Sequence, residues 1–203
     1  MDDFEQAKDI IITGVLRSYG LLATGQTTVR GGSKPLNTPE NKSPDKQRKA
    51  SNLAAQATLL ANQDNWDEAE SLFSEAIELD PSYALAYKYR GIARWNQNET
   101  SGALADCNKY LELRPGDAEA YRMRGRIKGK MGKHAEAIED FTRAIEHGDN
   151  DGNLSISFYL RGYAQFTLKK YKGAIQDFDE AIKLDPKYEY AYYSRGLCKR
   201  HID

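Results

Sequence analysis

The sequence predicts an all-α fold made of a repeated pair of helices, and two observations support this prediction. Small residues return with a step of 34 residues along most of the chain, and large apolar residues keep fixed distances from them. Within each unit the apolar positions follow the i, i+3, i+4, i+7 spacing of an amphipathic helix. Turn-forming residues interrupt this spacing inside each unit and again at its end, so each unit is expected to hold two helices.

The repeated positions become clear when columns are numbered from the first residues of the units, which are Ala50, Ala84, Ala118, Ser155 and Glu189. Column 4 is large and apolar, at Leu53, Tyr87, Tyr121, Phe158 and Tyr192. Column 8 is always small, at Ala57, Gly91, Gly125, Gly162 and Gly196. Column 20 is alanine, at Ala69, Ala103, Ala137 and Ala174, and column 24 reads Phe73, Cys107, Phe141 and Phe178. The small residues allow two helices to approach closely, while the aromatic side chains fill the space beside them.

This pattern resembles the tetratricopeptide repeat, which also carries a proline at column 32, here Pro81, Pro115 and Pro186. The resemblance covers the units 50–83, 84–117, 118–151 and 155–188 and a final single helix over 189–201. It implies a right-handed α-solenoid of helix-turn-helix repeats whose first helices line a concave groove. It also implies protein binding rather than catalysis, so we expect a non-enzymatic scaffold or adaptor with no cofactor.

The third unit departs from the pattern, because Asp149 replaces the proline and three residues follow before the register resumes. We therefore expect a longer loop over residues 147–153. The loop is rich in Asp, Asn and Gly, but it lacks the ligand spacing and the final glutamate of a calcium loop. An ordinary turn is the preferred interpretation.

Arginine recurs at column 7, at Arg90, Arg124, Arg161 and Arg195, while aspartate recurs at column 23, at Asp106, Asp140 and Asp177. The first unit lacks both residue types at these columns. This joint absence predicts an ion pair between the two helices of each unit. Pairing with the neighbouring unit, and a ligand-binding role for the arginines, are the alternatives.

The candidate binding residues lie on the stripe of each first helix that faces away from its partner helix, at columns 2, 5, 9, 12 and 13, with column 6 beside it. Basic residues in the middle of this stripe are flanked by aromatic ones, and Tyr, Trp and Arg are frequent interface anchors. The predicted partner segment therefore carries acidic and apolar residues. The predicted contact residues are Lys88, Tyr89, Ile92, Trp95, Arg122, Met123, Arg126, Lys130, Tyr159, Tyr163, Phe166 and Tyr193.

Two other binding functions are weaker alternatives. A co-chaperone adaptor in this family uses a clamp with Asn at columns 9 and 6, but column 9 here is Thr58, Ile92, Arg126 or Tyr163. Single-stranded RNA could stack on basic and aromatic residues. The net charge of −1 gives no bulk basic field, so no nucleic acid is expected.

The chain outside the repeats divides into two segments. Apolar residues at helical spacing predict an amphipathic helix over residues 1–22, and the Gly, Ser, Thr, Asn and Pro content of 23–42 predicts a flexible linker. The repeat domain then spans 43–203, and Pro44 is a good first residue for its first helix. The N-terminal helix could pack on the repeats, dock on a partner or a second copy, touch a membrane surface, or stay disordered.

The final helix is unusually rich in tyrosine for a helix that ends a stack, since a cap should be polar on its outer face. It could be a contact surface, including one for self-association, the start of a longer array, or a cap with tyrosines at its rim.

Composition sets the remaining expectations. Two cysteines do not form a disulfide framework or a zinc site, so no metal is expected. No apolar stretch is long enough to span a membrane, and the acidic start does not fit a secretory signal. A cytoplasmic location is the default expectation.

Overall fold

The computed structural model describes residues 44–148 and 153–202, and these residues form nine α-helices and no strand. The predicted helix over 1–22 and linker over 23–42 lie outside the described residues. The helices are α2 (Pro44–Ala61), α3 (Trp66–Leu79), α4 (Ala84–Asn96), α5 (Thr100–Leu113), α6 (Ala118–Lys130), α7 (His134–Glu146), α8 (Leu154–Thr167), α9 (Tyr171–Leu184) and α10 (Glu189–Arg200).

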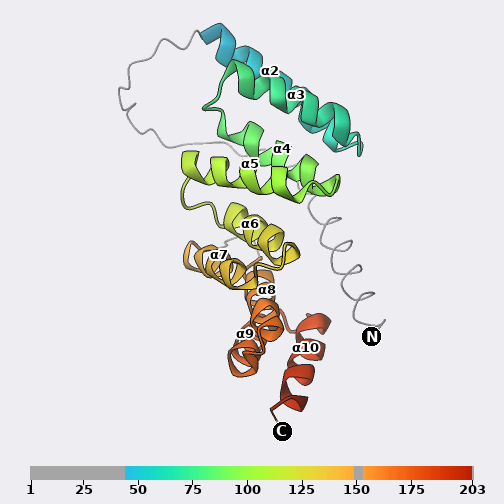
Figure 1. Ribbon diagram of the computed structural model, residues 1–203, viewed down its shortest axis with the longest axis vertical. Coiled ribbons are helices and arrows are strands. Elements are labelled where there is room, and N and C mark those ends of the chain that lie inside the picture. The colour runs from blue at the N-terminus through green and yellow to red at the C-terminus, as the bar shows by residue number, and fades with distance from the viewer. Residues whose placement is uncertain (1–43, 149–152, 203) are drawn as a thin grey trace. The chain divides into compact units, whose positions relative to one another are not determined.

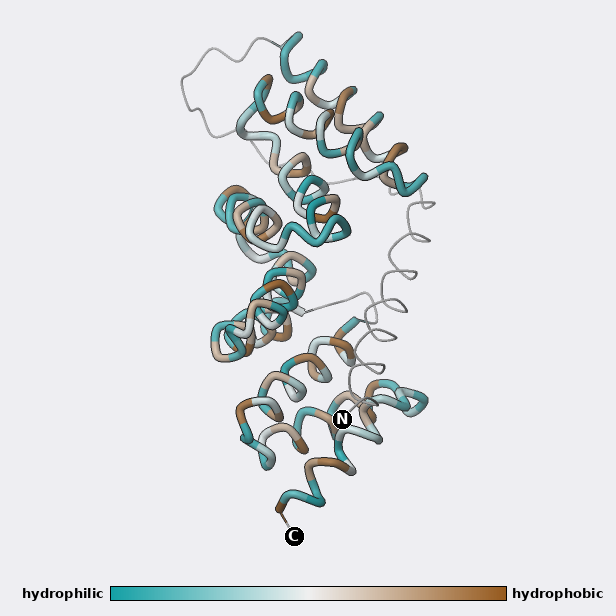
Figure 2. The backbone as a smooth tube through the Cα atoms, turned by 45° about the vertical axis from the view of Figure 1, so that its right-hand side comes forward, coloured by the Kyte–Doolittle hydropathy of each residue, from teal (hydrophilic) through white to brown (hydrophobic). Residues whose placement is uncertain are grey.

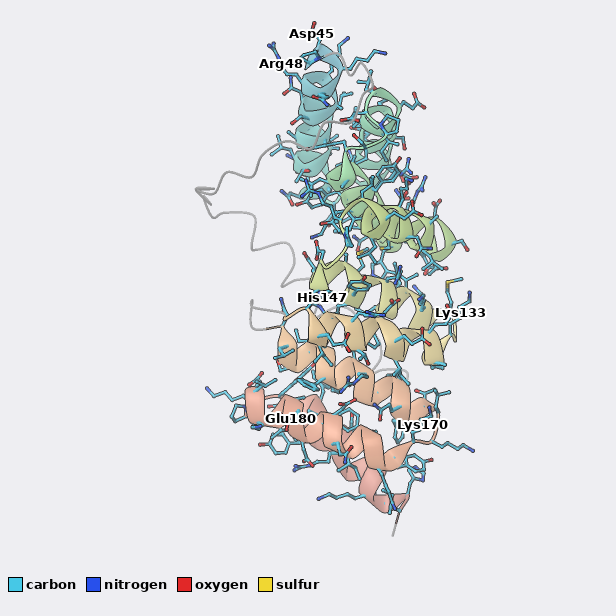
Figure 3. All side chains as sticks on the ribbon, turned by 90° about the vertical axis from the view of Figure 1, so that its left-hand side faces the viewer. Asp45, Arg48, Lys133, His147, Lys170 and Glu180 are labelled. Carbon is cyan, nitrogen blue, oxygen red and sulfur yellow. The ribbon has the colours of Figure 1, made fainter. Side chains whose placement is uncertain are left out.

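Residues 43–203 form one compact unit in which helix pairs follow one another in chain order (Figure 1). Each helix packs mainly against the next, so that α2–α3, α4–α5, α6–α7 and α8–α9 are pairs and α10 packs on α9. First helices also touch across repeats, α2 with α4, α6 with α8, and α8 with α10. Figure 3 places Lys133 and Lys170, which belong to turns within repeats, toward one edge of this unit, and His147 toward the opposite edge. The predicted all-α repeat solenoid is confirmed.

The seam within each pair is built from the small and aromatic columns. The column 20 alanines, with Phe73 and Phe178 at column 24, are all 0% exposed, and Phe141 is 3% exposed. A Cβ added to Gly125 would meet the Phe141 ring at 2.7 Å, and one added to Gly162 would meet the Phe178 ring at 2.9 Å. Glycine is therefore required for this close approach. Figure 2 shows apolar and polar residues alternating along the helices, as amphipathic helices require.

The connections between helices lie where the turn-forming residues predict them. Helix α3 ends at Leu79, and the connection to α4 contains Pro81. In this connection the Asp80 carboxylate accepts a hydrogen bond from the backbone N–H of Ser82 at 3.1 Å. The other connections between repeats are residues 114–117, 147–153 and 185–188, of which 147–153 joins α7 to α8. The expected longer loop falls largely on residues 149–152, which lie outside the described residues.

The predicted arginine–aspartate pairs are present in all three repeats. Arg90 donates from Nε and Nη2 to the two carboxylate oxygens of Asp106 at 2.9 and 2.7 Å. Arg124 binds Asp140 at 2.9 and 2.6 Å, and Arg161 binds Asp177 at 2.9 and 2.7 Å, in the same two-pronged geometry. The three aspartates are 2–4% exposed. These arginines therefore hold the two helices of a repeat together.

The third guanidinium nitrogen of each of these arginines binds the preceding repeat, so the alternative of pairing with the neighbouring repeat is also correct in part. Nη1 of Arg90, Arg124 and Arg161 donates to column 25 of the preceding second helix, at Ser74 (3.2 Å), Asn108 (3.1 Å) and Thr142 (3.2 Å). Each arginine thus ties together three helices from two repeats.

Candidate partner-binding surface on the first helices

Two of the predicted contact residues at column 5 of the first helices are buried. Arg122 is 1% exposed and Tyr159 is 2% exposed, so the expectation that this column faces a ligand is wrong for these two residues. The ring centroid of Tyr159 lies 5.0 Å from that of Tyr188 in the next connection. The side-chain hydroxyl of Tyr159 is hydrogen-bonded to Ser194 in α10. Burial raises the pKa of Tyr159 to about 12. Tyr159 therefore packs between repeats, and Arg122 is buried within the array.

Lys88 also occupies column 5, and its charge is used by the next repeat. Its ammonium forms an ion pair with Glu119 and lies 3.6 Å from Asp117. Burial of the ammonium lowers the pKa of Lys88, but the nearby Glu119 and Asp117 carboxylates outweigh that effect, and the pKa is raised overall. Lys88 is 14% exposed in its side chain, so it offers little to a ligand.

A cluster of Trp95, Arg126 and Lys130 brings together three predicted residues from two neighbouring first helices. The Arg126 guanidinium lies 5.6 Å from the Trp95 ring centroid, and the Lys130 ammonium lies 4.7 Å from it. Lys130 also donates a hydrogen bond to Asn98 in the turn after α4. Trp95 and Arg126 are half-buried, while Lys130 is exposed. We call these three residues the cation–indole cluster.

The environment of this cluster fixes its geometry. Trp95 and Met123 pack against the buried residues Ala103, Cys107 and Ile127, so the indole has a rigid support. A cation over an aromatic face is attracted by the ring quadrupole, and the two basic groups are thereby held on the same side of α4 and α6. The arrangement can accept a carboxylate and an adjacent apolar side chain.

The other predicted residues are mostly packing elements. Tyr89 stacks on Phe73 with centroids 6.0 Å apart, and Ile92 is half-buried. The ring of Tyr163 lies 6.4 Å from that of Tyr159, while Phe166 lies 5.7 Å from Tyr171. Tyr193 in α10 differs from all of these because it is 56% exposed.

The predicted set leaves out two column 2 residues that the structure exposes. Leu85 in α4 is 42% exposed and Tyr190 in α10 is 37% exposed. Their column was part of the predicted stripe, so the available signal was the column position.

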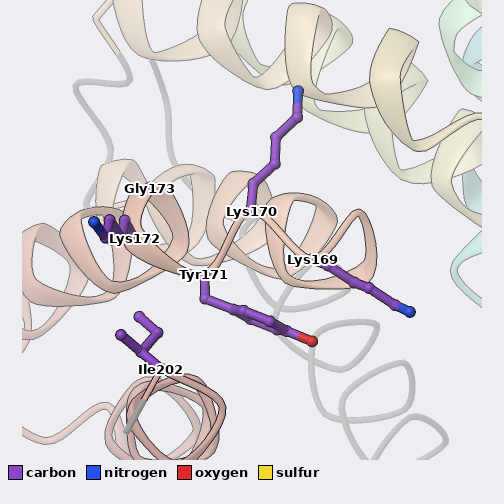
Figure 4. Close-up of a pocket in the computed structure, with 6 residues that line it drawn as sticks. All are labelled: Lys169, Lys170, Tyr171, Lys172, Gly173 and Ile202. Atoms are coloured by element: carbon purple, nitrogen blue, oxygen red, sulfur yellow. The ribbon is translucent and has the colours of Figure 1, made fainter.

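A shallow depression lies where the α8–α9 turn meets the end of the chain. It is lined by Lys169, Lys170, Tyr171, Lys172, Gly173 and Ile202. Figure 4 shows the three lysine side chains pointing in different directions, so they do not converge on one anion. Among the described residues there is no cluster of His, Cys, Asp and Glu that could hold a metal ion, and no helix is long and apolar enough to cross a membrane.

Comparison with solved structures finds the same fold in several repeat proteins. A fragment of MamA from Desulfovibrio magneticus RS-1, beginning at its residue 41, is 20% identical, with a TM-score of 0.71 over 76% of this chain and 86% of that chain. YrrB, described as a TPR protein with an unusual peptide-binding site, is 22% identical, with a TM-score of 0.69 over 77% and 80%. The first TPR domain of Spaghetti (RPAP3), bound to the HSP90 peptide SRMEEVD, is 23% identical, with a TM-score of 0.56 over 60% and 94%. At these identities the likeness shows the fold alone.

Sequence comparison identifies the family directly. No curated protein sequence matches the chain. Three family profiles, each described as tetratricopeptide repeat, match residues 54–118, 118–146 and 155–188. These matches, together with the helix pairs and their buried alanine seams, show that the chain belongs to the tetratricopeptide repeat family.

Proposed function

We propose that the protein is an adaptor that binds an extended or helical segment of a partner protein along the surface of its first helices. The repeat fold supports a scaffold for protein–protein interaction, since such solenoids present extended binding surfaces. The cation–indole cluster is the observation that carries the proposal. It combines Trp and Arg, two residue types that dominate interface energetics.

The chemistry of the cluster defines the partner segment. Arg126 and Lys130 favour a carboxylate, and the Trp95 face favours an apolar or aromatic side chain beside it. Lys88 and Arg122 are not part of the proposed site, because Lys88 is paired with Glu119 of the next repeat and Arg122 is buried. The remaining contacts extend toward the exposed Leu85 on one side and Tyr190 and Tyr193 on the other.

The peptide-bound RPAP3 domain does not transfer a chaperone role to this chain. The clamp of the co-chaperone group needs asparagine at column 9 of one repeat and at column 6 of the next. In this chain column 9 is Thr58, Ile92, Arg126 or Tyr163, and column 6 is never asparagine. An acidic segment remains the preferred ligand, but of a different sequence from a chaperone terminus.

Affinity capture with the wild type and an Arg126→Glu, Lys130→Glu variant tests the proposal. Partners of the proposed surface should be lost from the variant, and a peptide from such a partner should bind at least about tenfold more weakly in titration. The matched control is Lys183→Glu on α9, whose side chain is 74% exposed on a second helix. Equal binding by the variant and the control would remove the cluster from the site.

A further inference from the structure

The turns inside the third and fourth repeats each expose a large apolar side chain at the same position. Met131, between α6 and α7, and Leu168, between α8 and α9, both occupy column 14, and each is 37% exposed. In the first two repeats this column holds glutamine, at Gln63 and Gln97. Both turns lie inside the array, between described helices. The exposure of apolar residues at these two turns therefore asks for a functional explanation.

The turn of the fourth repeat is also strongly basic. Three exposed residues, Lys169, Lys170 and Lys172, follow Leu168. Within the described residues no carboxylate forms an ion pair with any of these three lysines. Figure 4 shows their side chains spread in different directions, so they do not close around one anion. Each can instead meet a separate charge on a surface that carries many negative charges.

The turn of the third repeat continues this basic surface. Lys133 lies two residues after Met131, its side chain is 47% exposed, and its contact with Glu136 is long, at 3.9 Å. Figure 3 places Lys133 and Lys170 toward the same edge of the repeat unit. The exposed lysines and apolar residues of the two turns are called the basic edge, and they are Met131, Lys133, Leu168, Lys169, Lys170 and Lys172.

The equivalent turns of the first two repeats have the opposite charge. Columns 15 to 19 of these repeats contain Asp64, Asp67, Glu68 and Glu99, and they contain no lysine or arginine. The net charge of −1 therefore conceals a division along the array, with acidic turns in the first two repeats and the basic edge in the next two. A negatively charged surface would attract one half of the array and repel the other, which would fix the orientation of the protein on that surface.

The backbone at Lys169 indicates that this positive charge is kept at a cost. Column 15 adopts the left-handed conformation in all four repeats, with φ of 59° at Asp64, 68° at Asn98, 77° at Gly132 and 59° at Lys169. Glycine, asparagine and aspartate adopt this conformation most readily, and lysine does not. The Lys169 side chain is exposed, so packing does not require it. A role for the charge at the surface accounts for a lysine at this position.

We propose that the basic edge binds the surface of an anionic phospholipid bilayer, with Met131 and Leu168 inserted among the lipid headgroups. The negative potential of such a bilayer attracts lysines close to it, and exposed apolar side chains gain free energy by entering the boundary of the acyl region. Charge and insertion together supply the two signals that firm attachment to a bilayer needs. The acidic turns would direct the first two repeats away from the lipid.

The composition of the basic edge favours a bilayer over a nucleic acid or an acidic protein segment. The two turns contain lysine and no arginine, whereas phosphate and carboxylate recognition often uses the two-pronged guanidinium. Tyr171, the aromatic residue between the lysines, already stacks on His201 with ring centroids 4.8 Å apart, so it is not an open platform for a base. The basic edge shares no residue with the cation–indole cluster, and this proposal does not rest on the proposed function.

Co-sedimentation of the full chain with phosphatidylcholine vesicles, prepared with and without phosphatidylserine, tests the proposal. We expect binding only to the vesicles that contain phosphatidylserine, and weaker binding at high salt because the charges are exposed. A Lys169→Glu, Lys170→Glu, Lys172→Glu variant should bind these vesicles at least about tenfold more weakly.

The matched control changes the net charge by the same amount outside the basic edge. It is a Lys109→Glu, Lys183→Glu, Lys187→Glu variant, in which Lys183 lies in the last turn of α9, whereas Lys170 is the N-cap of that helix. The control should keep most of the binding to phosphatidylserine vesicles. Equal weakening by the two variants would show that net charge alone is responsible and would overturn the proposal.

Two further variants separate insertion and folding from charge. Met131→Gln with Leu168→Gln installs the residue of the first two repeats at column 14 and leaves the charge unchanged, and it should weaken vesicle binding about fivefold. Lys169→Gly suits the left-handed backbone, so the Tm should not fall, while vesicle binding should weaken about fivefold. Loss of binding without loss of stability would exclude misfolding as the cause.

Three other results would overturn the proposal. The first is a wild type that does not bind phosphatidylserine vesicles. The second is full binding by the Met131→Gln, Leu168→Gln variant, which would show that no side chain enters the bilayer. The third is displacement of the protein from vesicles by polyuridylate or polyglutamate that itself binds through the same lysines, which would identify a nucleic acid or an acidic protein segment as the partner.

Discussion

The inner first helices α4, α6 and α8 and the last helix α10 share one sequence pattern but have opposite environments. At column 5, Tyr159 in α8 is 2% exposed and Tyr193 in α10 is 56% exposed. At column 8, Gly162 lies against Phe178 and Gly196 lies against nothing within 4 Å in the described residues. The repeat pattern therefore specifies which neighbours a helix can accept, and within the described residues these neighbours are present for α8 and not for α10.

The largest expected difference between inner and terminal positions is at the ion pairs. Asp140 is 2% exposed, binds Arg124 through both oxygens, and lies 2.8 Å from Lys128. Asp140→Ala leaves two cations without their shared carboxylate, and we expect a loss of about 3 kcal/mol in the free energy of unfolding. Asp179→Ala, at the half-exposed pair with Arg195, should cost less than about 1 kcal/mol. Urea unfolding followed by circular dichroism measures both, and equal losses would contradict the comparison.

The column 8 glycines give the second test. Gly125→Ala places a methyl group against the Phe141 ring at 2.7 Å, and overpacking should destabilise the protein by about 2 kcal/mol. Gly196→Ala meets open space in the described structure, and the better helix propensity of alanine should stabilise the protein by up to about 1 kcal/mol. Opposite signs in thermal unfolding are the expected outcome. A destabilising Gly196→Ala would show that another helix already covers this residue.

The two buried thiols report local opening at each position. Cys107 lies inside the second repeat and Cys198 lies in α10, and burial raises their pKa values to about 12 and about 11. Because α10 packs only on α8 and α9 in the described structure, Cys198 should become accessible about tenfold faster than Cys107. Thiol-labelling rates of the Cys107→Ser and Cys198→Ser variants measure this difference. Similar rates would indicate that the array opens as a single unit.

The smallest expected effect is a pH dependence at an inner repeat contact. Burial raises the pKa of Asp117, but its hydrogen bonds with Tyr110 and Ala120 and the charge of Lys88 lower it overall. A lowered pKa in the folded protein adds stability above the ordinary Asp pKa of 3.8, and this is lost as the pH falls through the folded value. Asp117→Asn keeps a good N-cap residue but removes the charge, so it should cost about 1 kcal/mol at neutral pH. The difference from wild type should shrink as the pH falls through the folded pKa of Asp117, which lies below 3.8, and a difference that stays constant in acid would contradict this assignment.

The repeat seams could be predicted from the sequence because their determinants recur. Alanine at column 20 and glycine at column 8 are local requirements of two packed helices, and their spacing is visible in a single chain. The Arg90–Asp106 pair was likewise predictable, since both members are absent together from the first repeat. Each of these contacts joins residues at a fixed sequence separation.

Burial of the candidate site could not be predicted in the same way. Arg122 and Tyr159 lie on a stripe that faces away from their own partner helix, but both are buried, and Tyr159 contacts the next connection and α10. Amphipathic spacing describes one helix and does not show how far the next repeat overlaps it. The Trp95–Arg126 contact joins two repeats as well, and the sequence indicated only that both residues share the same stripe.

The arginine contacts have a consequence for how such a chain can change in length. Arg90 binds Asp106 sixteen residues ahead and Ser74 sixteen residues behind, and Arg124 binds Asp140 and Asn108 at the same separations. A duplication or deletion of one whole repeat would therefore reconnect each guanidinium with an equivalent acceptor on both sides. Genetic recombination could lengthen or shorten the protein without creating a mismatched junction.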